Sequence, residues 1–280
     1  MNIIKKNIPN FITSLNIASG TLSIIFAFEG LITISAYLIL LAAVFDFLDG
    51  MSARLLNAYS ELGKQLDSLA DLISFGLAPA IIVYHIMKST LLIDKLYFSN
   101  IDTIKLLYLF AVLLIPIFSA LRLAKFNIDT KQTSSFIGLP TPANALFFAS
   151  IPIISSQNPF DPFLFLVYNK DVLLGIILVS SFLLVSPIPM FSFKFKNLKF
   201  KDNILRFSFL FMILLIIGIT GASSFNLLVS IIVELRFWEL FEELFYILTK
   251  ALPLIIFLYI LLSILNSLFI KFTKQNKINS

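Results

Sequence analysis

Apolar runs of about 20 residues recur along the whole chain, and they restrict its fold more than any other feature. Hydrophobic residues make up 59% of the sequence, the mean hydropathy is +0.96, and only 13% of the residues are charged. A soluble core of 280 residues could not bury so much apolar surface. A bilayer, in contrast, requires helices of about this length. We therefore predict an all-α polytopic membrane protein.

Eight segments are candidate transmembrane helices. They run roughly over residues 10–28, 31–56, 64–87, 104–125, 139–156, 171–190, 205–233 and 247–270. Cytoplasmic loops of membrane proteins are enriched in lysine and arginine. If the N-terminus lies inside, this arrangement places 15 of the 21 basic residues on the inner side. We therefore expect about eight transmembrane helices with both termini in the cytoplasm.

Cysteine and histidine usage excludes several kinds of site. The chain has no cysteine, which excludes disulfides, thiolate metal sites and a cysteine nucleophile. Its single histidine, His85, lies in an apolar run with no evident partner, so a Ser-His-Asp triad is not supported. We expect His85 to be a core residue.

Four aspartates lie in the stretch DFLDGMSARLLNAYSELGKQLDSLAD, residues 46–71. Asp46 and Asp49 are near the inner end of the second predicted helix, and Asp67 and Asp71 are in the first two turns of the third. The linker NAYSE is short enough to keep the two helices adjacent. At about 100° per residue, the acids of each helix share one face. All four carboxylates are thus predicted to converge at the inner edge of one helical hairpin.

Such a cluster needs a positive partner, because four carboxylates in a partly desolvated site repel one another. Hard divalent cations prefer oxygen ligands, and Mg²⁺ commonly bridges carboxylates to substrate phosphates. Gly50, Ala53 and Gly63 leave space between the helices, and Arg54 can pair with phosphate oxygens. One aspartate alone could be a solvated helix cap. Four of them on facing surfaces favour a diphosphate held on metal.

The spacing of these residues resembles the signature of the CDP-alcohol phosphatidyltransferase family. All eight positions of that signature are matched, namely Asp46, Asp49, Gly50, Ala53, Arg54, Gly63, Asp67 and Asp71. The resemblance implies that an alcohol attacks the lipid-bearing phosphate of a CDP-linked lipid and that CMP leaves. It also implies one or two divalent ions, Mg²⁺ or Mn²⁺, bound by Asp46, Asp49, Asp67 and Asp71.

The resemblance assigns further roles to the same positions. Asp71 resembles the general base toward the attacking hydroxyl. The small residues Gly50, Ala53 and Gly63 would shape the cytidine pocket, and Arg54 would contact the diphosphate. Phosphoryl transfer fits such a site, because it depends on positioning and charge neutralisation more than on covalent chemistry.

Three other stretches resemble the members of this family that use serine, the phosphatidylserine synthases. They are IPNFITSLNIASG at 8–20, RLAKFN at 122–127 and FIGLPTPANA at 136–145. The likeness implies CDP-diacylglycerol and L-serine as substrates. Lys125 stands where the usual motif has arginine, which keeps the charge and loses bidentate geometry.

Four residues of these stretches are candidate contacts for the acceptor or a phosphate: Arg122, Lys125, Thr141 and Asn144. Arg122 and Lys125 emerge at the inner end of the fourth predicted helix, where interface cations are also common. Ordinary helix capping is the alternative for Thr141 and Asn144.

We expect residues 1–190 to form the catalytic membrane domain, followed in 191–280 by a basic cytoplasmic loop and two more transmembrane helices. The expected location is the inner membrane of a prokaryotic cell, with the active site facing the cytoplasm and the lipids of the membrane around the helices. The family resemblance implies a homodimer, and we expect no nucleic-acid partner.

Two alternatives remain open from the sequence. One is a family member with another acceptor, glycerol 3-phosphate or inositol phosphate, which would require additional basic residues near the site. The other is a cation-coupled transporter, which predicts internal repeats and a site near the middle of the bilayer. The aspartates instead lie at one edge, and no repeat is evident.

Overall fold

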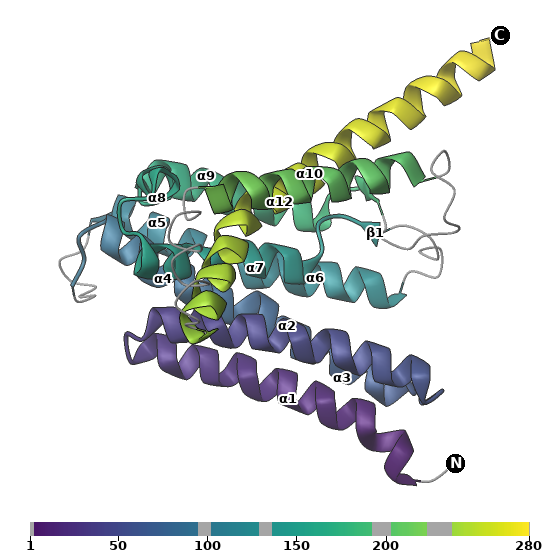
Figure 1. Cartoon of the computed structure of the whole chain (residues 1–280), viewed down its shortest axis with the longest axis horizontal. Helices are drawn as coiled ribbons and strands as arrows, with labels where there is room; N and C mark the ends of the chain where they lie inside the picture. Colours follow the sequence, from purple (N-terminus) through teal and green to yellow (C-terminus); the bar gives the residue numbers. More distant parts are fainter. Residues whose placement is uncertain (1–2, 95–101, 129–135, 192–202, 223–236, 280) are drawn as a thin grey trace. The chain divides into compact units, whose positions relative to one another are not determined.

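The computed structural model describes residues 3–94, 102–128, 136–191, 203–222 and 237–279 (Figure 1). The chain divides into two compact units. The first comprises Met1–Asp129 and Pro140–Val185, and the second comprises Thr130–Leu139 and Ser186–Ser280. Each unit is described by itself.

The first unit is helical throughout its described residues and contains the predicted aspartate hairpin. Its elements in chain order are α1 (Ile3–Phe28), α2 (Ile32–Leu55), α3 (Glu61–Asp71), the π-helix η1 (Leu72–Leu77), α4 (Ala78–Thr90), α5 (Thr103–Ala111), α6 (Leu114–Ile128), α7 (Thr141–Gln157), α8 (Pro162–Val167) and α9 (Lys170–Val185).

Helices α1 and α2 form a long antiparallel hairpin (Figure 1). The turn between them contains Gly30 at φ 78°, a conformation that is strained for residues with a side chain. Near this turn the buried Ser23 hydroxyl of α1 donates to the carbonyl oxygen of Ser35 in α2 at 2.8 Å. This bond satisfies two polar groups between the helices and fixes the pairing of α1 with α2.

The segments α3, η1 and α4 run on from one another as a continuous helical stretch, Glu61–Thr90. Its first turn is capped by Ser60, whose side chain accepts a hydrogen bond from the Gly63 backbone N–H at 3.0 Å. The π-helical segment begins directly after Asp71. Such segments are rare and often occur at functional sites.

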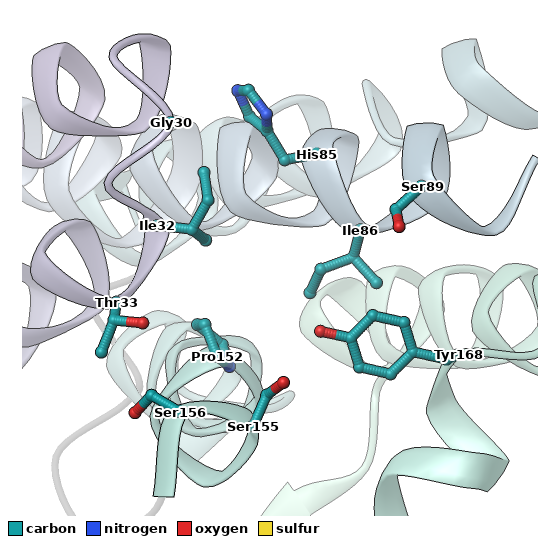
Figure 2. Close-up of a pocket in the computed structure, with 10 residues that line it drawn as sticks. All are labelled: Gly30, Ile32, Thr33, His85, Ile86, Ser89, Pro152, Ser155, Ser156 and Tyr168. Atoms are coloured by element: carbon teal, nitrogen blue, oxygen red, sulfur yellow. The ribbon is translucent and has the colours of Figure 1, made fainter. Parts of the chain in front are cut away.

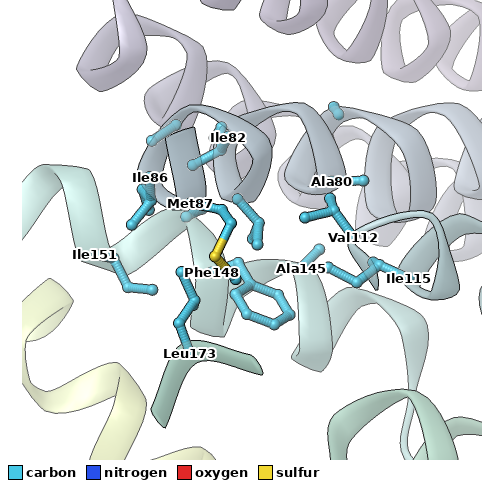
Figure 3. Close-up of a cluster of buried hydrophobic side chains, with 14 of the residues drawn as sticks. Ala80, Ile82, Ile86, Met87, Val112, Ile115, Ala145, Phe148, Ile151 and Leu173 are labelled. Atoms are coloured by element: carbon cyan, nitrogen blue, oxygen red, sulfur yellow. The ribbon is translucent and has the colours of Figure 1, made fainter. Parts of the chain in front are cut away.

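A buried apolar cluster holds the helices of the first unit together (Figure 3). Ile82, Ile86 and Met87 of α4 pack there with side chains from α6, α7 and α9, of which Phe148 is the largest labelled. Many apolar side chains on the outside of the same helices are exposed, as Phe47 of α2 is. An apolar exterior around a packed interior is the arrangement expected of helices in lipid.

The second unit contains α10 (Ile204–Ala222), α12 (Phe237–Asn279) and two strands of two residues each, β1 (Phe136–Ile137) and β2 (Pro189–Met190). The strands pair antiparallel, with Phe136 opposite Met190. Aromatic side chains of Phe191, Phe209 and Tyr259 pack against one another, and the Tyr259 hydroxyl donates to the Phe191 carbonyl at 3.2 Å.

The predicted fold class is confirmed, since the described residues are almost entirely helical and six helices are long and apolar enough to cross a membrane. These six lie at Asn7–Phe28, Ile32–Leu55, Glu61–Thr90, Thr103–Ile128, Ile204–Ala222 and Phe237–Phe269. The fifth and sixth predicted segments form the shorter helices α7 and α9, of 17 and 16 residues. The end of the seventh, residues 223–233, lies outside the described residues. The count of eight and the cytoplasmic termini stay predictions.

Substitution of Gly20 tests the packing of α1 against η1. A Cβ at Gly20 would lie 2.7 Å from the Ser74 Cα, so Gly20→Ala must push the two helices apart. We expect a loss of about 1–3 kcal/mol in unfolding free energy. Gly175→Ala in α9, where a Cβ meets open space, is the control and should be neutral or stabilising. Thermal unfolding in detergent measures both, and equal melting temperatures would contradict this packing.

Candidate functional site

Three of the four predicted aspartates meet between the end of α2 and the start of α3. Carboxylate oxygens of Asp46, Asp49 and Asp67 all lie within 4.8 Å of one another, a spacing that could hold a metal ion. Asp46 and Asp67 are half-buried, and Asp49 is only 5% exposed. Because α2 and α3 are antiparallel with a short turn between them, the end of one helix brings its acids to the start of the other.

A residue of α1 fixes the most buried of these acids. The Thr13 hydroxyl donates to the Asp49 Oδ2 at 2.7 Å, and Thr13 is itself buried. A hydrogen bond to an ionised group is shorter and stronger than one between neutral groups. Thr13 therefore holds one rotamer of Asp49.

Asp71 lies outside the three-carboxylate set but belongs to the same electrostatic group. It is 9% exposed, and it interacts electrostatically with Asp46, Asp67 and the Arg122 guanidinium of α6. Its Oδ1 is buried and has no hydrogen-bond partner among the described residues. A buried carboxylate oxygen without a partner is costly, which makes it a candidate contact for a bound group.

Arg122 connects the aspartates to α7. The guanidinium Nη1 donates to the Thr141 Oγ1 at 2.9 Å, and both residues are buried. Asn144 lies one turn further along α7 and is 1% exposed, and its Nδ2 has no partner among the described residues. Of the four residues suggested as acceptor or phosphate contacts, Arg122, Thr141 and Asn144 are therefore buried. Lys125, in contrast, is exposed on α6.

The small residues of the signature lie beside the acids. A Cβ at Gly50 would meet only the Arg54 guanidinium at 3.8 Å, so the space above this residue is open. Arg54 is exposed, and its Nε donates to the Gly50 carbonyl at 2.8 Å. At Gly63 a Cβ would lie 2.9 Å from the Asn10 Oδ1, so any larger residue would displace the Asn10 side chain. Ala53 is half-buried on the same turn of α2 as Gly50.

Helix α1 supplies site residues that sequence reasoning did not assign. Thr13 is one, and Asn16, one turn further along α1, is the other. Asn16 is completely buried, and neither its Nδ2 nor its Oδ1 has a hydrogen-bond partner among the described residues. Its carbonyl accepts from the Ser74 hydroxyl at 3.0 Å, which places it against η1. One sequence pattern could have identified them, namely a polar residue at every third position of an apolar helix, at Thr13, Asn16 and Ser19.

Comparison with known proteins gives a match that covers this site. The sequence model of a family described as CDP-alcohol phosphatidyltransferase matches residues 6–187. Several similar proteins carry the name CDP-diacylglycerol--serine O-phosphatidyltransferase. One from Mycobacterium leprae is 39% identical over 50% of this chain and 44% of its own length. One from Helicobacter pylori is 35% identical over 62% of this chain and 69% of its own length. One from Methanocaldococcus jannaschii is 29% identical over 80% of this chain and 89% of its own length. The chain thus spans less than half of the first relative and most of the third.

Replacement of Asn16 separates a binding role from a packing role. Asn16→Leu removes two unpartnered polar atoms and keeps a similar volume, so the melting temperature should stay the same or rise. Ser23→Ala on the same helix removes a hydroxyl that bonds to Ser35, and it should lower the melting temperature. Thermal unfolding in detergent compares the two variants. A lower melting temperature for Asn16→Leu would show that the amide stabilises the fold.

Proposed function

Because the chain belongs to the CDP-alcohol phosphatidyltransferase family, we propose that it transfers the phosphatidyl group of CDP-diacylglycerol to L-serine, giving phosphatidylserine and CMP. The observation that supports this most directly is the set of three carboxylates within 4.8 Å, at the end of the hairpin that carries the family signature. The names of the relatives favour serine as the acceptor.

The carboxylates fit a divalent cation. All the ligand atoms they offer are oxygens, which suits Mg²⁺ or Mn²⁺, and the unpartnered Oδ1 of Asp71 adds a fourth acid beside them. Asp46, Asp49 and Asp67 would hold the ion, with Asp71 as the further predicted ligand. Such an ion, when bound, neutralises the diphosphate and the charge that develops on it.

The protein side chains would then position the reactants. The serine hydroxyl attacks the phosphorus that carries the diacylglycerol, and the bond from this phosphorus to the oxygen of the CMP phosphate breaks. Asp71 would accept the hydroxyl proton, and its buried Oδ1, which has no partner among the described residues, supports this role. CMP leaves with the bonding electron pair on its phosphate oxygen. The open space beside Gly50, on the same turn as Ala53, would leave room for the cytidine, whereas Gly63 packs against Asn10. The exposed Arg54 would contact the diphosphate.

The acceptor site is proposed beside Arg122. This guanidinium interacts with Asp71, and its contact with Thr141 fixes its orientation. A serine carboxylate on Arg122 would bring the serine hydroxyl toward Asp71, whereas Asn144 offers an amide donor nearby. Asn16 on the opposite helix offers both a donor and an acceptor. These groups match the carboxylate and amine of an amino acid better than an apolar alcohol.

The setting of the reaction is part of the proposal. We propose that the protein is integral to the inner membrane of a prokaryotic cell and that the aspartates face the cytoplasm. A homodimer is the oligomeric state that the family resemblance implies. We likewise propose residues 1–190 as the catalytic membrane domain and residues 191–280 as the segment that follows it.

Removal of single acids tests the metal site. Asp49→Asn and Asp67→Asn keep the size of each side chain and remove its charge. Each should lower Mn²⁺-dependent CMP release by at least about 100-fold, because a lost ligand forfeits several kcal/mol of charge stabilisation. The assay uses purified protein with CDP-diacylglycerol and serine.

The control for this assay is Asp102→Asn. Asp102 caps α5 and is exposed, and asparagine caps a helix equally well. Its activity should equal that of the wild type. Full turnover in excess chelator, or wild-type activity of both site variants, would refute the metal site without refuting serine as acceptor.

The choice of acceptor is tested separately. Serine, glycerol 3-phosphate and inositol phosphate are offered in parallel to the wild type with Mn²⁺ and CDP-diacylglycerol. We expect CMP release with serine alone. Arg122→Lys keeps the charge but loses the fork geometry, so the KM for serine should rise about 10-fold. Lys170→Arg, at an exposed position outside the proposed site, is the control and should change nothing. Release with glycerol 3-phosphate or inositol phosphate instead of serine would overturn the acceptor.

A further inference from the structure

A cavity lies at the end of the first unit opposite to the aspartates (Figure 2). Its volume is about 340 Å³, within the range of small-ligand sites. It is formed by the turn between α1 and α2, the first turn of α2, the middle and end of α4, the last turns of α7 and the residue after α8. Thr33 and Asp46 are separated by 13 residues of α2, which is roughly 20 Å along a helix. The cavity is therefore distinct from the proposed active site.

Hydroxyl groups converge in this cavity. In Figure 2 the hydroxyls of Thr33, Ser155 and Tyr168 turn toward the space between α2, α4 and α7. None of the three has a hydrogen-bond partner among the described residues. His85 lies at the edge of the cavity, and its Nε2 is buried without such a partner. Polar groups in this state need a ligand or water to complete their hydrogen bonds.

The remaining wall of the cavity is apolar. Ile32, Ile86 and Pro152 line it, and no aspartate, glutamate, lysine or arginine is among the ten lining residues. The lining residues therefore offer a phosphate no lysine or arginine to neutralise it, and Lys88, which interacts electrostatically with His85, is not among them. Hydroxyls both donate and accept, so they match an uncharged group that also carries hydroxyls.

The surroundings of the cavity point to a lipid rather than a free solute. Its lining comes from the ends of apolar helices, the level at which lipid headgroups lie. Exposed apolar side chains flank it, with Phe28 68% and Leu31 46% exposed beside Gly30, and Leu166 56% exposed beside Tyr168. Acyl chains could run along these side chains while the headgroup fills the cavity.

We propose that this cavity binds the uncharged, hydroxyl-bearing headgroup of a membrane lipid, of which diacylglycerol is the simplest example. The site is separate from the catalytic one and does not depend on the proposed reaction. Thr33, Ser155 and Tyr168 hydrogen-bond the headgroup hydroxyl and ester oxygens, and Ile32, Ile86 and Pro152 pack against the glycerol backbone.

The test is a titration of the purified full chain in detergent with dioleoylglycerol, with thermal stability as the readout. A diazirine-labelled diacylglycerol then maps the contact by peptide mass spectrometry. We expect saturable stabilisation and labelling of residues 28–33 or 152–168. Dioleoylphosphatidylglycerol tests whether an anionic headgroup is accepted, and free glycerol tests whether a soluble polyol suffices.

Four variants locate the effect. Thr33→Val removes one hydroxyl at constant shape and should weaken binding about fivefold. Ser155→Leu fills the cavity and should abolish binding, and Thr21→Val, an exposed change on α1, should not alter it. Asp49→Asn should also leave the titration unchanged, which separates this site from the catalytic one. If Ser155→Leu does not fold, the affinity of Thr33→Val for dioleoylglycerol tests the proposal by itself.

The proposal is overturned by any of three results. The first is no saturable effect of dioleoylglycerol. The second is an unchanged affinity in Thr33→Val. The third is an equal affinity for phosphatidylglycerol or free glycerol, which would mean that the cavity does not select an uncharged lipid.

Discussion

The mutual repulsion of acidic side chains at the end of an apolar hairpin is the constraint on which the rest of the first unit depends. Asp46, Asp49 and Asp67 lie within 4.8 Å of one another although charged groups are costly to place in or near a membrane. Such an arrangement persists only if the surrounding helices hold it in place. The short turn between α2 and α3, the Ser60 cap and the Thr13 hydrogen bond to Asp49 provide that support.

Packing around the hairpin explains how an acidic site and an apolar exterior coexist. Helix α1 contacts both halves of the hairpin through polar residues, with Thr13 against Asp49 of α2 and Asn10 against Gly63 of α3. The apolar cluster around Phe148 ties α4 to α7 and α9. Buried polar residues such as Arg122 and Thr141 pair across helices. Rigid helices therefore carry every proposed site residue, as precise positioning of a diphosphate requires.

The hairpin could be predicted from the sequence because its information is local. The spacing of Asp46, Asp49, Asp67 and Asp71 fixes their faces once the helices are assigned, and the linker length makes the helices adjacent. The family resemblance was available from the same residues, and it is confirmed. The shorter lengths of α7 and α9 were not predicted, because apolar patterns mark the existence of a helix better than its ends.

Other features depend on contacts between distant segments, which residue patterns alone do not show. The Arg122 contact with Thr141 joins two helices, although each residue had been singled out separately. Thr13 and Asn16 were inside a recognised stretch, yet only the fold shows that they face Asp49 and η1. The π-helical turn after Asp71 and the cavity near His85, which five segments form, could not be read from residue patterns.

The central claim is that the aspartates of the hairpin hold the divalent ion on which phosphatidyl transfer depends. Anomalous X-ray scattering from crystals of the protein grown with Mn²⁺ and CDP-diacylglycerol tests it most directly. The account predicts an anomalous peak within coordination distance of Asp46, Asp49 and Asp67. A Mn²⁺ peak elsewhere, or none among these carboxylates at saturating Mn²⁺, would contradict it.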